Sequence, residues 1–282
     1  MAHLEHKITE IAPKIWCISE YKLVNAFAIE GETGLVLIDA TCGIGNLKET
    51  VRKISCKPVT ILLTHDHFDH NGGIYNFPEA EIFMHPDDDG LSRSMMGMSP
   101  DGTYNGLRDF YIRTRGPVRC PEYAVEDLLA LIPPENPRWE FSYAPVNHGD
   151  VITAGGRKLK VIHTPGHTDG SVCYLDSESG ILFSGDTVNN SIILMRQPGN
   201  DMKLVKRFNE TVKRLWELNT EYDVLAIGHD GTLMDKGIVK DYLDLTEGLL
   251  KGTITGEYQE TGFRKGDVAR LGKAELWYQC DA

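Results

Sequence analysis

The most telling stretch of this chain is Val59-Thr60-Ile61-Leu62-Leu63-Thr64-His65-Asp66-His67-Phe68-Asp69-His70. Its first five residues are apolar or β-branched and predict a buried strand, after which three histidines and two carboxylates follow. Each buried imidazole needs partners for both ring nitrogens, and three crowded imidazoles would repel one another if protonated. A divalent cation that takes one nitrogen from each ring resolves both difficulties. The strand also disfavours the alternative of a histidine-rich surface loop, so the stretch predicts a metal site.

Three further ligand candidates follow apolar runs in the second half of the chain. Each comes directly after a glycine, which permits close approach of the backbone. The three candidates are His167, Asp186 and His229. Taken singly, each is a weak signal, because a histidine after a strand is more often a hydrogen-bonded core residue. Together with the first cluster they indicate one site that both halves of the chain build.

The apolar runs come in two batches, and helical spacing follows each batch. The first batch comprises strands at 14–19, 24–30, 35–39, 59–63 and 80–84, with helices at 46–54 and from 71 onward. The second comprises strands at 151–153, 158–163, 172–175, 180–184 and 224–227, with helices at 201–218 and 237–251 and a weakly β end. This order predicts an α/β protein in which two sheets pack face to face with helices outside.

Residues 86–145 differ from the rest of the chain because they are rich in proline, methionine and arginine. They lack the apolar periodicity of an independent core, although 122–132 has the pattern of a helix. We therefore expect a single domain over 1–282, with 86–145 as an insertion that forms a lid or pocket wall. Met95, Met96 and Met98 are candidates for an adaptable apolar surface in it.

Composition narrows the function classes. The chain has 282 residues, of which 41% are hydrophobic and 25% charged, as in a globular protein with a sizeable core. Its net charge of −12 argues against a nucleic-acid partner, which needs a basic surface. The six cysteines form no CxxC pair and are expected to be free thiols in a reducing compartment. No signal peptide or membrane span is visible, so we expect a cytoplasmic protein without a membrane partner.

The seven ligand candidates resemble the metal-binding residues of the metallo-β-lactamase superfamily, over about residues 14–231 without the insertion. The resemblance implies an αββα four-layer sandwich with the site on one edge. It implies that His65, His67 and His167 hold one metal, that Asp69, His70 and His229 hold a second, and that Asp186 bridges them. Imidazole and carboxylate ligands suit two Zn²⁺ ions best, with Mn²⁺ or Fe²⁺ as alternatives.

Departures from individual branches narrow the resemblance to the glyoxalase II or lactonase-like dinuclear metallohydrolases. Superfamily enzymes that hydrolyse β-lactams commonly have Cys at the position of Asp186, and flavodiiron proteins commonly have Glu at the position of His67. Glyoxalase II shares all seven ligands, but its helical glutathione-binding domain has no counterpart in this tail. Relatives that process transfer RNA need a nucleic-acid arm, which neither the tail nor the net charge supports.

We therefore expect a dinuclear metal-dependent hydrolase that attacks a small-molecule ester, thioester or lactone with a metal-bridging hydroxide. Asp69 is expected to orient the hydroxide and to carry its proton. One alternative is a phosphodiesterase, which an arginine cluster in the insertion favours. Another is a mononuclear-iron persulfide dioxygenase, which would use only His65, His167 and Asp186. A non-catalytic binding module is the least favoured alternative, because all seven ligands are present.

We expect the insertion to contain the residues that contact the substrate. Its arginines stand out against an acidic background and either form salt bridges on a solvated face or clamp a substrate carboxylate or phosphate. A tyrosine in the insertion either packs in the lid or donates a hydrogen bond from its hydroxyl to the oxyanion that develops on the substrate. The candidates are Tyr104, Tyr111, Arg113 and Arg115, with Arg108 and Arg119 in the same cluster. Asp39, which ends a strand, is expected to orient a metal-bound histidine. The insertion's apolar residues leave a homodimer open.

Overall fold

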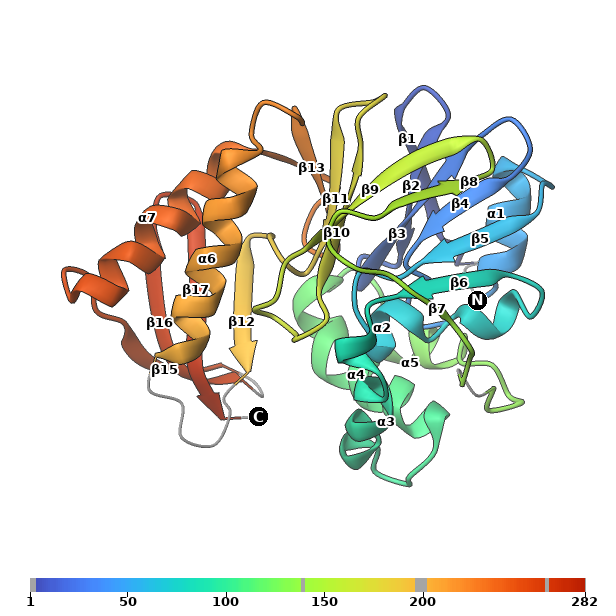
Figure 1. The fold of residues 1–282 in the computed structure, drawn as a ribbon. Helices are drawn as coiled ribbons and strands as arrows, with labels where there is room; N and C mark the ends of the chain where they lie inside the picture. The colour runs from blue at the N-terminus through green and yellow to red at the C-terminus, as the bar shows by residue number, and fades with distance from the viewer. Residues whose placement is uncertain (1–3, 138–139, 196–201, 262–263, 282) are drawn as a thin grey trace.

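Two β-sheets face each other in this protein, and a third, smaller sheet packs against a helix of the second half of the chain (Figure 1). The computed structural model describes residues 4–137, 140–195, 202–261 and 264–281. The first sheet has the strand order β1 to β7, and the second has the order β14-β13-β11-β10-β9-β8. This arrangement follows the two batches of apolar runs in the sequence.

The first sheet begins with antiparallel hairpins and continues with parallel strands. Its strands are β1 (Lys7–Ala12), β2 (Ile15–Glu20), β3 (Val24–Glu30), β4 (Leu35–Ile38), β5 (Val59–Leu62), β6 (Glu81–Met84) and β7 (Ala144–Pro145). From β4 to β7 all neighbours are parallel, so the carboxyl ends of β4 and β5 lie side by side. The segments after these two strands therefore meet at one edge of the sheet.

The second sheet is mainly antiparallel. Its strands are β8 (Val151–Ala154), β9 (Arg157–His163), β10 (Val172–Asp176), β11 (Ile181–Gly185), β13 (Val224–Ile227) and β14 (Leu233–Asp235). β11 and β13 form a parallel pair in which Gly185 lies opposite Ile227. The residues that follow these two strands are consequently neighbours, as on the first sheet.

Helices cover the outer faces and confirm the predicted four-layer αββα sandwich. The helices are α1 (Leu47–Ile54), α2 (Phe68–Asn71), α3 (Leu91–Ser94), α4 (Tyr104–Arg119), α5 (Val125–Leu129), α6 (Lys203–Glu217) and α7 (Gly237–Lys251). Fully buried side chains such as Phe27 and Phe183 fill the space between the sheets, where their rings lie 5.4 Å apart. Leu47 and Val51 of α1 cover the first sheet, while α6 and α7 cover the second.

Three predicted helices differ from the observed ones. The helix after the histidine stretch ends at Asn71 rather than beginning there, and a 3₁₀ turn over Ile74–Asn76 follows. Its end is tight, since a Cβ on Gly72 would lie 2.4 Å from the Cys42 carbonyl oxygen. The helix expected over 122–132 is limited to α5. The helix expected from residue 201 begins at Lys203, and residue 201 itself lies outside the described residues.

The weakly β end of the chain forms a sheet that the sequence patterns did not predict. Its strand order is β12 (Ser191–Met195), β17 (Ala274–Asp281), β16 (Arg264–Leu271) and β15 (Glu257–Thr261). β12 leaves the second half of the sandwich just after Asp186 and runs parallel to β17. Leu276 and Tyr278 of β17 share a buried cluster with Tyr242 of α7. The C-terminal segment is therefore tied to the chain that leads away from Asp186.

The insertion packs against the main sandwich. Leu107 and Ile112 of α4 lie in a buried cluster with Leu23 and with Phe68 of α2. Residues 138–139 of the predicted insertion lie outside the described residues. Among the helices in the described part of the chain, none combines the length and the apolar character needed to cross a membrane.

Candidate metal centre

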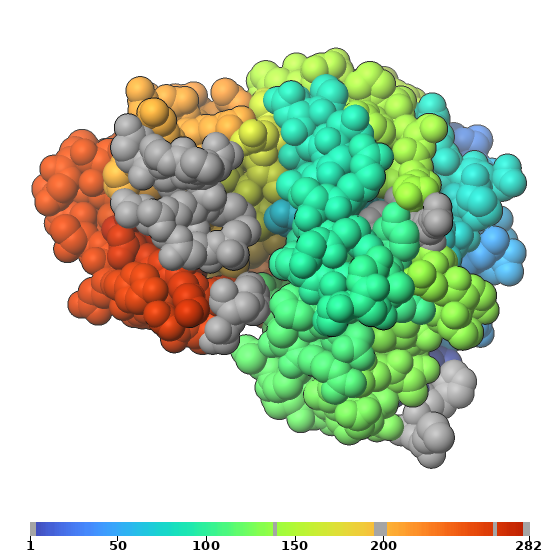
Figure 2. All heavy atoms as spheres, turned by 90° about the horizontal axis from the view of Figure 1, so that it is seen from below, coloured from blue at the N-terminus to red at the C-terminus, as the bar shows by residue number. Residues whose placement is uncertain are grey.

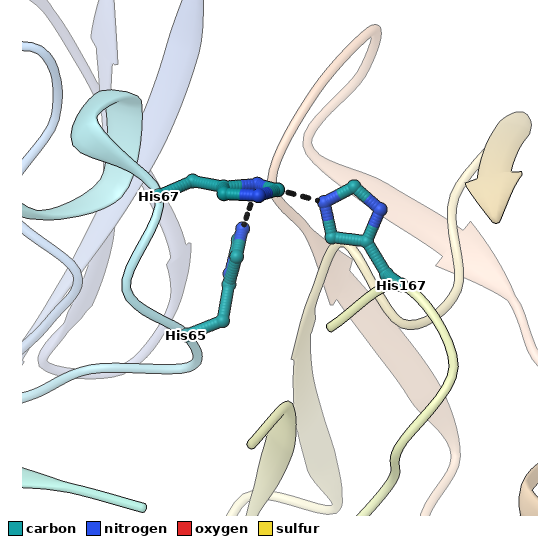
Figure 3. Close-up of side chains that lie close together, drawn as sticks. All are labelled: His65, His67 and His167. Carbon is teal, nitrogen blue, oxygen red and sulfur yellow. Dashed lines mark hydrogen bonds between the residues drawn. The ribbon is translucent and has the colours of Figure 1, made fainter. Parts of the chain in front are cut away.

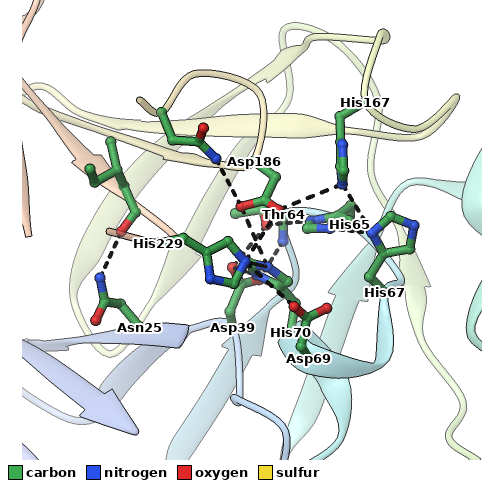
Figure 4. A network of polar contacts seen from close by, with 12 residues as sticks. Asn25, Asp39, Thr64, His65, His67, Asp69, His70, His167, Asp186 and His229 are labelled. Atoms are coloured by element: carbon green, nitrogen blue, oxygen red, sulfur yellow. Dashed lines mark hydrogen bonds and ion pairs between the residues drawn. The ribbon is translucent and has the colours of Figure 1, made fainter. Parts of the chain in front are cut away.

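The seven ligand candidates meet where strands of both sheets end (Figure 4). His65 and His67 follow β5, Asp69 and His70 lie in α2, His167 lies between β9 and β10, Asp186 follows β11 and His229 follows β13. The two sheets contribute comparable shares of the cluster. The site thus depends on the packing of one sheet against the other.

The first group is formed by His65, His67 and His167, whose rings converge (Figure 3). His67 Nδ1 lies 3.1 Å from His65 Nε2 and 3.0 Å from His167 Nε2. Two tetrahedral ligand nitrogens at ~2.05 Å from a metal would be about 3.3 Å apart, which is close to these distances. The three nitrogens therefore fit a single divalent cation.

The second group is formed by Asp69, His70 and His229. His229 Nε2 lies 3.3 Å from His70 Nε2 and 3.5 Å from Asp69 Oδ2. Asp186 lies between the groups, with Oδ1 3.6 Å from His70 Nε2 and Oδ2 3.3 Å from His229 Nε2. The same Oδ2 is 3.6 Å from Nε2 of His167, so this carboxylate reaches both groups. Its position fits a bridging ligand.

Acceptors at the opposite ring nitrogens fix the orientation of three of these histidines. Each acceptor takes the Nδ1 proton and leaves the Nε2 lone pair facing the cluster, as metal-binding histidines require. The pairs are His65 with Thr64 Oγ1 at 3.1 Å, His70 with Asp39 Oδ2 at 2.8 Å and His167 with the Ile193 carbonyl at 2.9 Å. Nδ1 of His229 lies 2.8 Å from the Leu23 carbonyl and also contacts the Arg119 guanidinium. The imidazoles of His65, His70 and His167 are thus oriented with Nε2 toward the cluster.

Glycines allow the two sheets to approach at the cluster. A Cβ on Gly228, the residue before His229, would lie 2.7 Å from Asp186 Oδ1. Gly185, with φ +50°, would place a Cβ 2.3 Å from Thr64 Oγ1. The same Cβ on Gly228 would lie 2.9 Å from His70 Cε1, so Gly185 is required by the approach of Thr64 and Gly228 by the approach of Asp186 and His70.

Burial and mutual repulsion keep the imidazoles of His65 and His67 neutral. Burial, with a further contribution from His70, lowers the pKa of His65 well below its usual value. Burial and the neighbouring His167 lower the pKa of His67 to about 3. Burial opposes ionisation of Asp69, but electrostatic attraction to the neighbouring imidazoles prevails, first that of His70, and lowers the pKa of Asp69 to about 2. Neutral imidazoles and an ionised carboxylate are the forms that bind cations.

A cavity of about 1040 Å³, including its part open to solvent, lies over the cluster. Figure 2 shows this face, with the teal and green insertion beside a hollow and the yellow to red second half of the chain on its other side. Side chains of both parts line it together with His67, Asp69, His167, Asp186 and His229. The cavity therefore gives a ligand access to the metal-binding residues.

Two of the four predicted substrate residues line this cavity. Tyr111 donates from its hydroxyl to Asp69 Oδ2 at 2.8 Å, and Arg115 lies one helical turn further along α4. The other two do not line it. Tyr104 donates to Glu140 and borders a separate, smaller depression, while Arg113 is exposed and pairs with Asp109. We therefore leave Tyr104 and Arg113 out of the proposed substrate site.

Other residues of the cavity had weaker sequence signals. Arg119 contacts His229, donates to the Leu23 carbonyl at 2.6 Å and to the Tyr111 hydroxyl at 3.0 Å. It stood in the arginine cluster of the insertion without a distinct role. Arg264 lines the cavity from β16. The sequence did not indicate Arg264, because the weak β pattern at the end of the chain did not show which strands pair there.

A four-layer sandwich with a histidine and aspartate cluster at its sheet ends fits a metal-binding enzyme. A sequence model described as the metallo-beta-lactamase superfamily matches residues 21–247. The chain therefore belongs to the metallo-β-lactamase superfamily, as the sequence analysis predicted.

Individual relatives agree with this membership. The acyl-coenzyme A thioesterase MBLAC2 of Gallus gallus is 28% identical over 203 residues, which cover 69% of this chain and 67% of that protein. A hydroxyacylglutathione hydrolase of Maricaulis maris is 56% identical over 43 residues, covering 15% of this chain and 17% of the relative. A metallo-beta-lactamase family protein, TTHA1429 of Thermus thermophilus, superposes with a TM-score of 0.59 at 22% identity, covering 86% of this chain and 82% of that chain. The last likeness concerns the fold alone.

Proposed function

We propose that this protein is a dinuclear metal-dependent hydrolase of a small ester, thioester or lactone. The observation that carries the proposal is the position of Asp186, whose carboxylate lies 3.6 Å from His167 of the first ligand group and 3.6 and 3.3 Å from His70 and His229 of the second. A mononuclear dioxygenase would use His65, His167 and Asp186 and would give no role to the second group. The structure of that second group, with its own positioned imidazoles, favours two cations.

The donor set fits zinc, with manganese or iron as alternatives, because imidazoles and carboxylates dominate it. Two such cations, when bound, would supply Lewis acidity and a water of lowered pKa at neutral pH. Asp69 faces the cavity and would accept a proton from the attacking water. The Tyr111 hydroxyl holds Asp69 in place through its hydrogen bond of 2.8 Å. Burial and Asp69 both raise the Tyr111 pKa, which keeps the phenol protonated as a donor.

The bond class is supported by the relatives and by the cavity. The two relatives described above are named as an acyl-coenzyme A thioesterase and a hydroxyacylglutathione hydrolase. Apolar residues such as Phe110, Ile192 and Ile193 line the cavity and would hold an acyl chain. In the reaction, water adds to the carbonyl carbon, the carbon–oxygen or carbon–sulfur bond breaks, and the alcohol or thiol leaves with a proton.

The proposal is tested by elemental analysis and a substrate panel. We expect about two zinc or manganese ions per chain and hydrolysis of 4-nitrophenyl butanoate, S-butanoyl pantetheine or γ-butyrolactone. Asp186→Ala should bind fewer metal ions and lose at least ~10³-fold in kcat/KM. Asp127→Ala, which removes an exposed carboxylate of α5, should match the unchanged protein in both measurements.

Two results would redirect the assignment. One iron per chain with no hydrolysis would favour the dioxygenase alternative. Turnover of bis(4-nitrophenyl) phosphate with none of the carbonyl substrates would favour the phosphodiesterase alternative, for which the cavity arginines provide some support. Full activity of Asp186→Ala with both metals bound would contradict the dinuclear scheme.

A further inference from the structure

Asp88 is a buried carboxylate that joins the two segments of the chain from which the first ligand group comes. His65 and His67 lie in the segment after β5, whereas His167 lies in the segment between β9 and β10 (Figure 3). Asp88 belongs to neither segment, because it ends the 3₁₀ turn over Pro86–Asp88 that follows β6. It is only 2% exposed. Burying a carboxylate is costly unless its oxygens accept hydrogen bonds, so the donors around Asp88 indicate its role.

The carboxylate of Asp88 accepts hydrogen bonds from both segments. Its Oδ2 accepts from the Asp66 amide at 3.2 Å and from Thr168 Oγ1 at 2.8 Å. Its Oδ1 accepts from the Gly170 amide at 2.6 Å. Asp66 stands between the two histidines of one segment, and Thr168 directly follows the histidine of the other. One side chain therefore holds residues that are adjacent in sequence to all three ligands of the first group.

Close packing surrounds these hydrogen bonds. A Cβ on Gly170 would lie 2.7 Å from both Cγ and the amide nitrogen of Asp88, so this position requires glycine. Asp66 and Thr168 are buried as well. The carboxylate of Asp66 in turn accepts from the Ser92 amide at 3.0 Å, which gives the segment after β6 a second contact with the histidine segment. The beginning of the insertion is thus attached to the first ligand group.

Other residues support the second ligand group. Tyr111 donates to Asp69, as described above. Asn25 holds the segment around His229, because its Nδ2 donates to the carbonyls that precede and follow that histidine, Ile227 at 3.0 Å and Gly231 at 2.6 Å. In the described part of the chain, the donors to Asp88 adjoin ligands of the first group alone. A change at Asp88 should therefore act on one group and spare the other.

We propose that Asp88 is a positioning residue for the metal ion that His65, His67 and His167 would hold, and that it acts on this ion and not on the second. The inference rests on the proposed dinuclear function and adds to it a residue of the insertion. Hydrogen-bonded groups behind metal ligands fix the geometry of the site, and their loss lowers metal affinity about ten-fold to a hundred-fold. Asp88 holds the backbone beside the ligands rather than their rings, so we expect an effect at the lower end of this range.

The test measures zinc affinity in two backgrounds that each keep one ligand group. His229→Ala keeps the first group, and His167→Ala keeps the second. Competition with a chromogenic chelator gives the dissociation constant of the remaining site and requires no enzymatic activity. Asp88→Asn preserves the size of the side chain but turns one acceptor oxygen into an amide nitrogen that faces a donor. We expect Asp88→Asn to weaken zinc binding about ten-fold in the His229→Ala background and less than about two-fold in the His167→Ala background.

Asp89→Asn is the matched control, because Asp89 is the next residue, carries the same charge and is exposed. It should leave zinc affinity unchanged in both backgrounds, which separates positioning from a loss of long-range attraction for the cation. If urea denaturation shows that Asp88→Asn does not fold, Thr168→Val removes one of the three hydrogen bonds with little change in volume. Thr168→Val should weaken zinc binding about three-fold in the His229→Ala background and leave the His167→Ala background unchanged.

The outcomes separate this inference from the function on which it rests. A loss of affinity confined to the His229→Ala background supports the positioning role. An equal loss in both backgrounds would mean that Asp88 supports only the fold, and this result, an unchanged affinity or an equal loss in Asp89→Asn would each overturn the inference while leaving the dinuclear proposal intact. If the protein without any substitution binds no zinc, manganese or iron, the dinuclear proposal fails and the role of Asp88 fails with it.

A second measurement avoids the background substitutions. At a chelator concentration at which the unchanged protein retains about two zinc ions per chain, Asp88→Asn alone should retain about one, because only the first group is weakened. Retention of both ions, or loss of both together, would contradict an effect on one group.

Discussion

Asp39 is a single carboxylate that positions a histidine in each ligand group. Its Oδ2 accepts from His70 Nδ1 at 2.8 Å and from Thr64 Oγ1 at 2.8 Å, and its Oδ1 accepts from the Thr64 amide at 2.8 Å. Because Thr64 Oγ1 donates to Asp39, it is free to accept from Nδ1 of His65 at 3.1 Å. Asp39 thus acts on His70 directly and on His65 through Thr64.

This arrangement predicts that Asp39→Asn weakens metal binding by about ten-fold to a hundred-fold, since an amide cannot accept all three hydrogen bonds. Thr64→Val removes the hydroxyl through which Asp39 acts on His65 but keeps the hydrogen bond between Asp39 and His70. It should therefore weaken metal binding less than Asp39→Asn does. Competition with a chromogenic chelator measures both affinities, and the thermal midpoint shows whether the fold survives. Unchanged affinity in Asp39→Asn would rule out the positioning role.

The cysteines give a second prediction at the scale of the residue. Cys17, Cys42, Cys120 and Cys173 are buried, whereas Cys56 is exposed. Burial raises the pKa of Cys17 to about 12 and those of Cys120 and Cys173 to about 11, so these thiols stay protonated and unreactive. In a Cys280→Ser background, a disulfide reagent at pH 8 should modify one thiol of the native protein rapidly. Peptide mapping should place the label on Cys56, and rapid labelling of a second site would contradict the described burial.

At the scale of the element, helix α4 is anchored by an arginine that the sequence grouped with the substrate candidates. Arg108 is fully buried, and its Nε and Nη2 donate to the carbonyls of Cys42 and Gly72 at 3.0 and 2.9 Å. It joins α4 to the segments that follow β4 and α2. The same helix presents Tyr111 and Arg115 to the cavity, so this anchor sets where they lie.

We therefore expect Arg108→Met to destabilise the fold by ~2–4 kcal/mol, because two buried carbonyl groups lose their charged donor. Arg113→Met, on the exposed face of α4, should change the free energy of unfolding by less than ~0.5 kcal/mol. Urea denaturation measures both changes. Equal stability of the two variants would show that the buried contacts of Arg108 contribute little.

At the scale of the whole molecule, the proposed metal centre joins the two sheets. One ligand group takes His167 from the second half of the chain and the other takes His229, while the other ligands of both groups follow β5 of the first sheet. Asp186, which lies between the groups, follows β11 of the second sheet. Bound cations would act as a cross-link that exists only in the folded state. Stability should therefore depend on metal concentration through mass action.

Zinc at a free concentration ~1,000-fold above its dissociation constant should raise the free energy of unfolding by about 4 kcal/mol over protein stripped with a chelator. Denaturant titrations with and without zinc measure this gain. Asp186→Ala should lose most of it, since the bridge between the groups is absent. A gain of the same size in Asp186→Ala would place the stabilising zinc elsewhere.

Local patterns in the sequence were sufficient to predict most strands and two facing sheets with helices outside. The resemblance of the seven ligand candidates to a known set of metal-binding residues predicted the superfamily and its four-layer fold. The run before His65 is a strand because its residues are apolar and β-branched, and that property needs no distant partner. The expected strand over 24–30 coincides with β3 for the same reason. The seven ligand candidates were visible because chemically distinctive side chains follow such strands, and the structure brings all seven together.

Only the tertiary structure decided which residues share the cavity and what each contacts. Tyr104 and Arg113 carry the same chemical groups as Tyr111 and Arg115, but their places on α4 turn them away from the cavity. Arg264 reaches the cavity because β16 pairs with β17 and β17 with β12, a register set by contacts between segments far apart in sequence. The sequence by itself determined the fold and the metal-binding residue types, since these depend on local periodicity. The substrate-facing wall depends on long-range pairing, for which a single sequence has no local signature.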